Sequence, residues 1–372
     1  MRLLRQISIS LFLLSLFANC YGFPQIRENT TFVVSKDYDL RGKTLIIPKG
    51  VTLKFDSGTI KNGIIVGTDT KISGRNFHIF DNVDVTGSWL VPSISSNMFY
   101  DLTNDNALRK VMSLANKKIN NTVTIEQGVY NFSFKRNQET GLLVEDNTTL
   151  DIKGVITITP NSFVNYQIIR VHGDNIVVKG RGILMGDRDN HIGEKGEWGM
   201  GIDVSQASNV QIKDLTIRDC WGDCVYIGKK SNNITVDNCN LYGSRRQGIS
   251  VTDAMNITIK NCQIYNIFGT LPGFAIDVEP NKNCKVENVV IENVTMSNCI
   301  GGVQLNGHAE RSLVKNITVK NCMIYNMDER YLVKCFDCQG ISFEACGIDE
   351  TANYILFKDC INASKKNITE YK

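Results

Sequence analysis

The residues from position 175 onward alternate between apolar and polar types, and the same alternation recurs along the chain. Two examples are Asn233-Ile-Thr-Val-Asp-Asn and Asn256-Ile-Thr-Ile-Lys-Asn. This period of two predicts β-strands with one apolar face and one polar face. The recurring segments start at residues 175, 209, 233, 256, 288, 316 and 340.

The spacing of these segments indicates a solenoid. Consecutive starts are 34, 24, 23, 32, 28 and 24 residues apart. A base period near 24 is too short for a βαβ unit of about 30 residues or more, but it fits one coil of three short strands. Stacked coils would bury their Ile and Val side chains in one continuous core, and the longer intervals would be loops. The repeated Asn suits corners, because Asn tolerates left-handed backbone conformations.

This pattern resembles the right-handed parallel β-helix proteins of the pectate-lyase-like superfamily. The resemblance covers nearly all of residues 24–372 and implies an all-β fold. Residues 104–118 are predicted to form an amphipathic helix, and the segment after it, 123–130, is similar to the first coil of that superfamily. We expect residues 99–372 to form the β-helix, residues 23–98 an N-terminal β module, and the short helix a cap on the solenoid.

The chain begins with the pattern of a secretory signal peptide, residues 1–22. Two arginines precede an apolar run at residues 7–17, which is too short to span a bilayer. Cleavage before Phe23 would give a secreted, periplasmic or cell-surface protein. A lipid anchor at Cys20 is the alternative, although Asn19 is unfavourable in a lipidation motif. No second apolar segment has the length of a membrane span.

Charge and cysteine content narrow the function classes. The chain has 41 basic and 38 acidic residues, a net charge of +3 and no block of Lys and Arg, which argues against nucleic-acid binding. Twelve cysteines suggest disulfides in a secreted chain, but several recur at one point of the repeat and predict stacked, buried thiols. Two pairs of cysteines that are close in sequence, 220/224 and 335/338, could still form disulfides.

The strand after each loop is predicted to place polar residues in one outward column. Aligning these strands gives Asp203, Tyr226, Ser250, Asp277, Gln304 and Lys334, with Glu279 and Asn306 two residues further on the same face. The corners before the strands add Asp223, Arg245, Arg246 and Gln247. Because stacked coils are about 4.8 Å apart, these side chains would line a groove for a polysaccharide or oligosaccharide.

Asp277 and Glu279 are the sharpest catalytic candidates. Residues i and i+2 of a strand face the same way, with Cα atoms about 6.5–7 Å apart. Two close carboxyl groups push their pKa values apart and supply the acid and base of glycoside hydrolysis. Arg245 or Arg246 could hold a substrate carboxylate or sulfate. The alternatives are a structural carboxylate paired with these arginines and a calcium site; no other cofactor or metal is expected.

A second motif, Trp221-Gly-Asp-Cys-Val-Tyr-Ile-Gly228, resembles the Gly-Asp-Asp-Cys-Ile-Ala-Ile segment of polygalacturonase-like hydrolases. The resemblance implies a catalytic Asp223, whereas the alternative is an Asp that caps the corner. The chain departs from that family, since Gly222 replaces the first Asp, Gln247 replaces a His, and the upstream motif has no Asp. A hydrolase on this scaffold would therefore draw carboxylates from elsewhere in the column.

Trp198 and His308 lie beside the column, and Tyr226 lies at its centre. Trp198 ends an acidic insertion, residues 187–198, that also contains His191; the insertion either forms a sugar-stacking wall or folds over a coil edge and buries Trp198. His308 lies just past the column and is either a base or an ordinary surface residue. Tyr226 is a stacking platform or a proton donor in elimination.

These observations predict a secreted polysaccharide-active protein, foremost a glycoside hydrolase that uses Asp277, Glu279 and Asp223. A polysaccharide lyase or uronate epimerase is the first alternative, because such chemistry needs cationic or phenolic groups to neutralise a carboxylate and move a proton. Those groups would come from Lys334, Arg245, Arg246 and Tyr226. A non-catalytic glycan-binding or structural solenoid is the third hypothesis.

Overall fold

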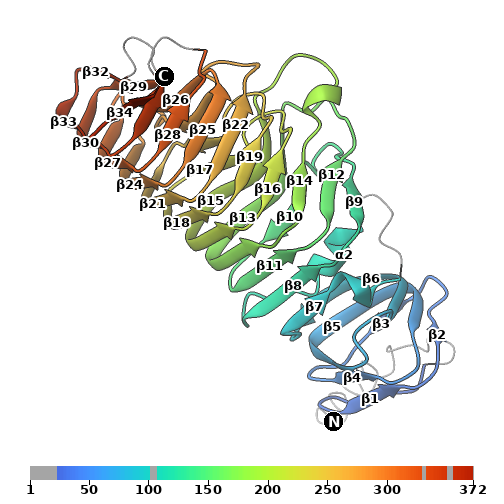
Figure 1. Ribbon diagram of the computed structural model, residues 1–372. Helices are drawn as coiled ribbons and strands as arrows, with labels where there is room; N and C mark the ends of the chain where they lie inside the picture. Colours follow the sequence, from blue (N-terminus) through green and yellow to red (C-terminus); the bar gives the residue numbers. More distant parts are fainter. Residues whose placement is uncertain (1–22, 101–106, 329–331, 350–354, 372) are drawn as a thin grey trace, which may run out of the picture.

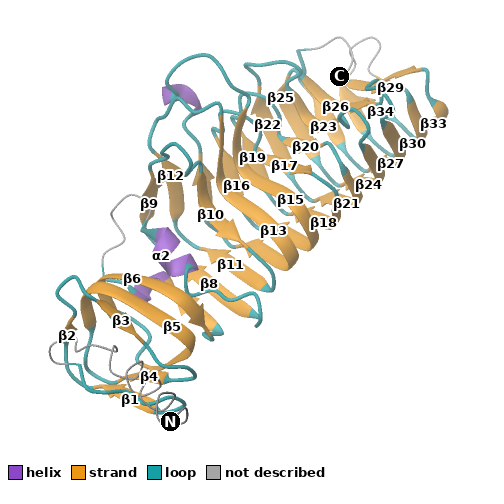
Figure 2. Cartoon of the chain, turned by 180° about the vertical axis from the view of Figure 1, so that it is seen from behind, coloured by secondary structure: helices purple, strands orange, loops and turns teal. Residues whose placement is uncertain are grey.

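The computed structural model describes residues 23–100, 107–328, 332–349 and 355–371. The predicted signal peptide, including Cys20, lies outside the described residues, as do residues 104–106 of the predicted helix. The described strands wind into an elongated solenoid with the N-terminal sheet at one end (Figures 1 and 2). Within the described part of the chain, no helix is both long and apolar enough to cross a bilayer.

Six parallel strands form the N-terminal sheet, in which β5 pairs with β2, β3, β4 and β6, and β1 pairs with β4. They are β1 (Thr31–Val34), β2 (Tyr38–Asp39), β3 (Thr44–Ile46), β4 (Thr52–Phe55), β5 (Ile60–Gly74) and β6 (Phe80–Trp89). Three short helices follow in the chain: η1 (Ser96–Met98), α2 (Leu108–Met112) and η2 (Arg188–Asn190).

The solenoid itself has three faces, two of which are joined into one sheet by the long strands β13 and β15. The first face contains β10 (Thr140–Val144), the starts of β13 (Asn165–Lys179) and β15 (Trp198–Lys213), β17 (Val225–Gly228), β20 (Ile249–Val251), β23 (Phe274–Val278), β26 (Gly301–Asn306), β29 (Val333–Phe336) and β32 (Ile355–Lys358). The second contains β7 (Ser93–Ser95), β8 (Asn121–Ile125), β11 (Thr148–Ile152), the ends of β13 and β15, β18 (Ser231–Asp237), β21 (Ala254–Lys260), β24 (Lys285–Glu292), β27 (Leu313–Lys320), β30 (Cys338–Glu344) and β33 (Ile361–Lys366).

The third face is a sheet of ten short strands. They are β9 (Val129–Phe132), β12 (Val155–Ile158), β14 (Ile183–Met185), β16 (Thr216–Arg218), β19 (Asn240–Tyr242), β22 (Gln263–Ile267), β25 (Thr295–Cys299), β28 (Met323–Tyr325), β31 (Gly347–Asp349) and β34 (Thr369–Tyr371). A coil therefore runs through one strand of each face, as β17, β18 and β19 do. The predicted coil of three strands is confirmed.

Alternate residues of each strand point into the solenoid and form its core. Ile202, Val225, Ile249 and Ile276 occupy equivalent positions of successive coils and are fully buried. The buried apolar cluster extends without a break from Val34 to Ile348. Burial of one such side chain contributes about 1.5–3 kcal/mol, and a strict period of two supplies several per coil.

The cysteines follow the same inward pattern. Cys239, Cys262, Cys322 and Cys346 are buried, and all eleven described cysteines are free thiols. The predicted stack of buried thiols is confirmed. The disulfides left open at 220/224 and 335/338 are not formed, since all four cysteines are free thiols buried in the core.

An asparagine ladder marks the corner that the sequence repeat predicts. Asn288 has a φ of 60°, donates to the Oδ1 of Asn256 at 2.9 Å and accepts from the Nδ2 of Asn316 at 3.1 Å. Asn233 likewise has a φ of 57° and bonds to Asn209 one coil earlier. The left-handed backbone that Asn tolerates thus allows each corner to hydrogen-bond to the next.

We expect Asn288→Val to destabilise the protein more than Asn288→Gly. Both variants lose the same two side-chain hydrogen bonds and must keep the left-handed conformation. Val adopts it at a steric cost of about 1–2 kcal/mol, whereas Gly adopts it freely. The difference between the two free energies of unfolding, measured in urea, isolates that cost. Equal losses of stability in the two variants would mean that the left-handed conformation at residue 288 does not penalise Val.

The capping helix is shorter than the sequence predicts. It ends at Met112 instead of Lys118. Asn116 explains the early end, because its Nδ2 donates to the Trp89 carbonyl at 2.8 Å and its Oδ1 accepts from the Lys118 amide at 2.9 Å. A side chain that bonds to nearby backbone competes with continued helix. Leu108 and Val111, on the inner face of the helix, are buried.

Candidate active site

The predicted polar column is present on the first face of the solenoid. In register, Asp203 pairs with Tyr226, Tyr226 with Ser250, Ser250 with Asp277, and Asp277 with Gln304. Lys334 follows Gln304 in the next coil. Parallel strands hold these positions one coil apart, so residues far apart in the sequence become neighbours. The neighbouring Ile and Val residues point into the core, which leaves the column on the outer side of the strands.

The column is much less exposed than an open groove would be. Asp203, Ser250 and Asp277 are only 4%, 1% and 2% exposed. The column faces outward as the sequence predicts, but these three side chains are covered instead of lining an open groove. Side chains on strands about 4.8 Å apart fill the space between coils, and here they satisfy each other through hydrogen bonds.

Asp277 lies at the centre of this network. Its Oδ2 accepts from the Nε2 of Gln247 at 3.0 Å, and its Oδ1 accepts from the Nε2 of Gln304 at 3.1 Å. Burial raises the pKa of Asp277 to about 8, and the charge of Glu279 adds to the rise. Asp277 therefore carries a proton at neutral pH.

The two glutamines differ in how they can respond to that proton. The Oε1 of Gln247 accepts from the Phe274 amide at 2.8 Å, which fixes Gln247 as a donor to Asp277. Gln304 has no such second bond among the described residues, so its amide can turn and accept. Because both oxygens of Asp277 accept hydrogen bonds from amides in the structure, a proton on Asp277 requires the Gln304 amide to turn and accept it.

Glu279 stands next to Asp277, just past the end of β23. Its Oε1 accepts from the Nδ2 of Asn306 at 2.8 Å, and its side chain is only partly buried. Its negative charge is among the causes that raise the pKa of Asp277. The predicted effect of two neighbouring carboxyl groups on each other is thus present at Asp277.

Asp223 is the second fully buried acid of the site. Its Oδ2 accepts from the Oγ of Ser250 at 2.7 Å and lies 3.4 Å from the Nη1 of Arg246, while its Oδ1 has no partner among the described residues. Burial raises the pKa of Asp223 to about 6, and Arg246 opposes the rise. Asp223 is therefore mostly ionised at neutral pH, where Asp277 is not.

The two adjacent arginines point to different places. Arg246 lies between Asp223 and Glu197, whose Oε2 is 3.4 Å from its Nε. Arg245 instead donates to the carbonyls of Gly196 and Glu194 at 2.8 and 3.1 Å. Arg245 therefore holds the insertion 187–198 and lies away from the carboxyl groups, contrary to the expectation that either arginine could serve the column.

The insertion is built on buried aromatic contacts. The guanidinium of Arg245 lies 3.8 Å from the ring centre of Trp221, and His191 stacks on the same ring at 4.0 Å. Asp187 accepts from the Nδ1 of His191 at 2.9 Å and from the hydroxyl of Tyr166. This buried network fixes the shape of the insertion.

Trp198 is exposed at the end of the insertion. Its exposed fraction is 52%, whereas Trp221 is buried. The alternative in which the loop buries Trp198 is therefore wrong. An exposed indole at the start of β15, the strand that carries Asp203, remains available for stacking on a sugar ring.

Of the other predicted residues, Tyr226 and Lys334 are members of the column, and His308 lies just past it. His308 is half-exposed and pairs with Asp337. The Nζ of Lys334 lies 5.5 Å from the ring centre of Phe274. Tyr226 accepts from the Oγ1 of Thr252 at 2.7 Å, and burial raises the pKa of Tyr226, so the phenol keeps its proton at neutral pH.

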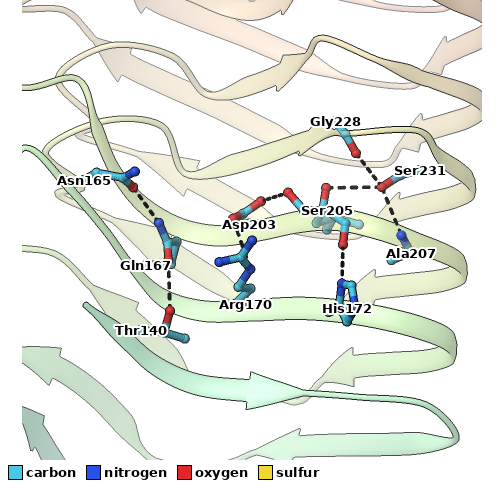
Figure 3. Close-up of polar contacts among 11 residues, drawn as sticks. Thr140, Asn165, Gln167, Arg170, His172, Asp203, Ser205, Ala207, Gly228 and Ser231 are labelled. Carbon is cyan, nitrogen blue, oxygen red and sulfur yellow. Dashed lines mark hydrogen bonds and ion pairs between the residues drawn. The ribbon is translucent and has the colours of Figure 1, made fainter. Parts of the chain in front are cut away.

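Sequence reasoning missed the part of the column on β13. Arg170 pairs in register with Asp203, and its Nε lies 3.8 Å from the Oδ2 of that acid (Figure 3). Ser205 donates to Asp203, and the Nδ1 of His172 lies 3.1 Å from the Ser205 carbonyl oxygen. The segment 168–171 alternates like 201–204, but the insertion of residues 187–198 separates the two and conceals the repeat.

Among the described residues, no group of three or more His, Cys, Asp and Glu side chains could hold a metal ion. The column brings carboxyl groups together with amides and with two arginines, Arg170 and Arg246.

Comparison with known proteins identifies the fold family. The family described as the right handed beta helix region matches residues 119–316, and the chain belongs to that family. The predicted right-handed parallel β-helix is thereby confirmed.

Two curated relatives come from Bacillus subtilis (strain 168). The uncharacterized protein YclG is 30% identical over 201 residues, which cover 46% of this chain and 34% of YclG. The SPbeta prophage-derived uncharacterized protein YorA is 28% identical over 152 residues, 35% of this chain and 26% of YorA. The matches thus span about a third or less of each relative.

Solved structures share the architecture at low identity. A rhamnogalacturonan lyase aligns with a TM-score of 0.51 and 14% identity, covering 70% of this chain and 74% of the lyase. The A-module of mannuronan C-5 epimerase AlgE4 from Azotobacter vinelandii aligns with a TM-score of 0.43 and 15% identity, covering 67% and 82%. At this level of identity, the likeness concerns the fold alone.

Proposed function

We propose that the protein is a secreted polysaccharide-active enzyme, a glycoside hydrolase in which Asp277 is the general acid. One observation carries the proposal: the pKa values of Asp277 and Asp223, two coils apart on the same face, are raised to about 8 and about 6. Between these values one carboxyl group is protonated and the other ionised. Two carboxyl groups in opposite protonation states are what glycoside hydrolysis requires.

The roles follow from protonation and access. Asp277 donates its proton to the glycosidic oxygen, and the substrate reaches that proton by displacing the Gln304 amide. Glu279 is the more exposed carboxyl group beside Asp277 and is the base or nucleophile of the reaction. Asp223 stays negative and stabilises positive charge at the sugar ring. Trp198 offers a stacking surface at one end of the column.

The lyase or epimerase alternative is less well supported. Proton abstraction next to a uronate carboxyl needs a base with a pKa near the working pH. Burial raises the pKa of Tyr226, which makes its phenol a poor base. Arg246 is already engaged by Asp223 and Glu197, so it is not free to neutralise a substrate carboxylate.

The test is a panel of neutral and acidic polysaccharides incubated with the full protein. New reducing ends without ultraviolet absorbance from unsaturated sugars are expected. Ultraviolet absorbance would assign the protein to the lyases instead. Binding without any new ends would support a non-catalytic glycan-binding solenoid.

We expect Arg246→Gln to shift the pH dependence of kcat/KM upward. Arg246 lowers the pKa of both Asp223 and Asp277, so its removal raises both. The wild-type enzyme needs Asp223 ionised and Asp277 protonated, which predicts a bell-shaped profile. Both limbs should move to higher pH by about one unit.

Arg245→Gln is the matched control for this shift. It removes the same charge from the adjacent residue, but Arg245 bonds to backbone carbonyls of the insertion and is not among the causes that shift either acid. Its profile should keep both limbs in place. Equal shifts in the two variants would mean that general charge, and not the Arg246 contact, sets the acid pKa values.

A further inference from the structure

We infer that the polar column continues beyond Asp203 into a subsite that binds an acidic group of the glycan. The site is a cavity of about 600 Å³ between helix α2 and strands β10 and β13. We call it the cap cavity, and its charged and polar lining includes Arg109, Thr140, Glu145, Arg170, His172 and Gln206. The nature of the ligand as a glycan rests on the proposed function.

The cap cavity is continuous with the column through Arg170. Arg170 belongs to both, since it lines the cavity and pairs in register with Asp203. Figure 3 shows Arg170 and His172 on β13, beside Asp203 and Ser205 on β15. A chain bound along the column would therefore extend into the cavity without changing face.

Arg109 places a fixed positive charge in the cavity wall. Its Nε and Nη2 donate to the carbonyls of Gly141 and Thr140 at 3.0 and 2.6 Å, and its guanidinium lies 5.1 Å from the ring centre of Phe132. Its Nη1 has no hydrogen-bond partner among the described residues. Neutral carbonyls orient this guanidinium, but no carboxylate of the described residues forms an ion pair with it.

Arg170 has hydrogen-bonding capacity to spare. Among the described residues, its one ion pair is with Asp203 at 3.8 Å, which is beyond hydrogen-bond distance. Asp203 also accepts a hydrogen bond from the Ser205 hydroxyl, so Arg170 is not its only partner in the described structure. The side chain is 33% exposed, and a guanidinium of this kind binds a carboxylate or sulfate through two parallel hydrogen bonds.

The acidic residue of the lining does not cancel these charges. Glu145 binds the Nζ of Lys117 at 2.8 Å, so its charge is already compensated. Two guanidinium groups thus face a cavity whose one carboxylate has its own lysine. An anion is the ligand that this arrangement favours, either a uronate carboxylate or a sulfate ester.

Matched polymers test the inference by affinity electrophoresis of the full protein. A polyuronate is compared with its carboxyl-reduced form, and a sulfated galactan with its desulfated form. The wild-type protein is expected to bind at least one acidic polymer about tenfold to a hundredfold more tightly than its neutral counterpart. The arm that shows the difference identifies carboxylate or sulfate as the acidic group.

Arg170→Gln should remove that preference, because it should lower the affinity for the acidic polymer far more than the affinity for the neutral polymer. Arg170→Lys keeps the charge without the planar fork and should retain part of the preference. Arg181→Gln, at the exposed turn between β13 and β14, is the control and should behave as wild type. Thermal melting checks that each variant is folded.

Two results would overturn the subsite: equal binding of acidic and neutral polymers by the wild-type protein, or an equal loss for both polymers in Arg170→Gln. The proposed function fails separately. A clear acid preference without any cleavage would keep the subsite and reject the hydrolase. If the protein cleaves the carboxyl-reduced or desulfated polymer as well as the acidic one, the hydrolase proposal stands and the subsite is rejected.

Discussion

The double variant Asp277→Asn/Glu279→Gln is expected to lower kcat by about a thousandfold or more while the protein stays folded. Asn cannot donate the proton that Asp277 holds at neutral pH, and Gln cannot act as base or nucleophile. General acid–base catalysis by one group contributes about a hundredfold to ten-thousandfold. Turnover of the polysaccharide found by the panel, measured as new reducing ends, checks this prediction.

A second double variant controls for the loss of two charges. Asp237→Asn/Glu292→Gln alters two acids on the second face of the solenoid, where they pair with Lys260 and Lys320. Turnover should be unchanged in this control. Unchanged turnover in the Asp277/Glu279 variant as well would remove the pair from the mechanism and leave it a structural role.

Asp277→Asn alone is expected to make the protein more stable than wild type at high pH. The pKa of Asp277 rises from 3.8 to about 8 on folding, so between these values the folded state binds a proton that the unfolded state lacks. Its contribution to stability is full below about pH 4 and is lost as the pH rises toward 8, by up to about 1.4 kcal/mol per pH unit. Asn removes this loss.

Urea unfolding at pH 5, 7 and 9 measures the effect. The advantage of Asn should grow with pH and reach a few kcal/mol at pH 9, whereas Asp237→Asn should show no such trend. Stability curves of wild type and Asp277→Asn that run parallel across this range would mean that Asp277 is not protonated in the folded protein. The general acid would then have to be another residue.

Together these results would separate function from structure at one position. A buried acid that weakens the fold at high pH is unexpected in a purely structural residue, because Asn would fit the same hydrogen bonds to Gln247 and Gln304 at lower cost. Strained or destabilising groups tend to occur at functional sites. Loss of turnover with a gain in stability would be the signature of a catalytic acid.

The sequence by itself determined the coil and the column. The period of two decides which side chains point inward, and a coil near 24 residues decides which positions are neighbours. Asp203, Tyr226, Ser250, Asp277 and Gln304 could therefore be placed in one register before the structure was known. The period of two and the repeat length can both be seen in the order of residues along the chain, so neither requires knowledge of long-range contacts.

Only the tertiary structure decided how that column is used. The burial of Asp277, and hence its proton, depends on Gln247 and Gln304 from other coils. The directions of Arg245 and Arg246 depend on the insertion packed beside them, although the two residues are adjacent in sequence. Arg170 joins the column across an insertion that conceals the repeat. Such features arise from contacts between distant residues, and local alternation carries no information about those contacts.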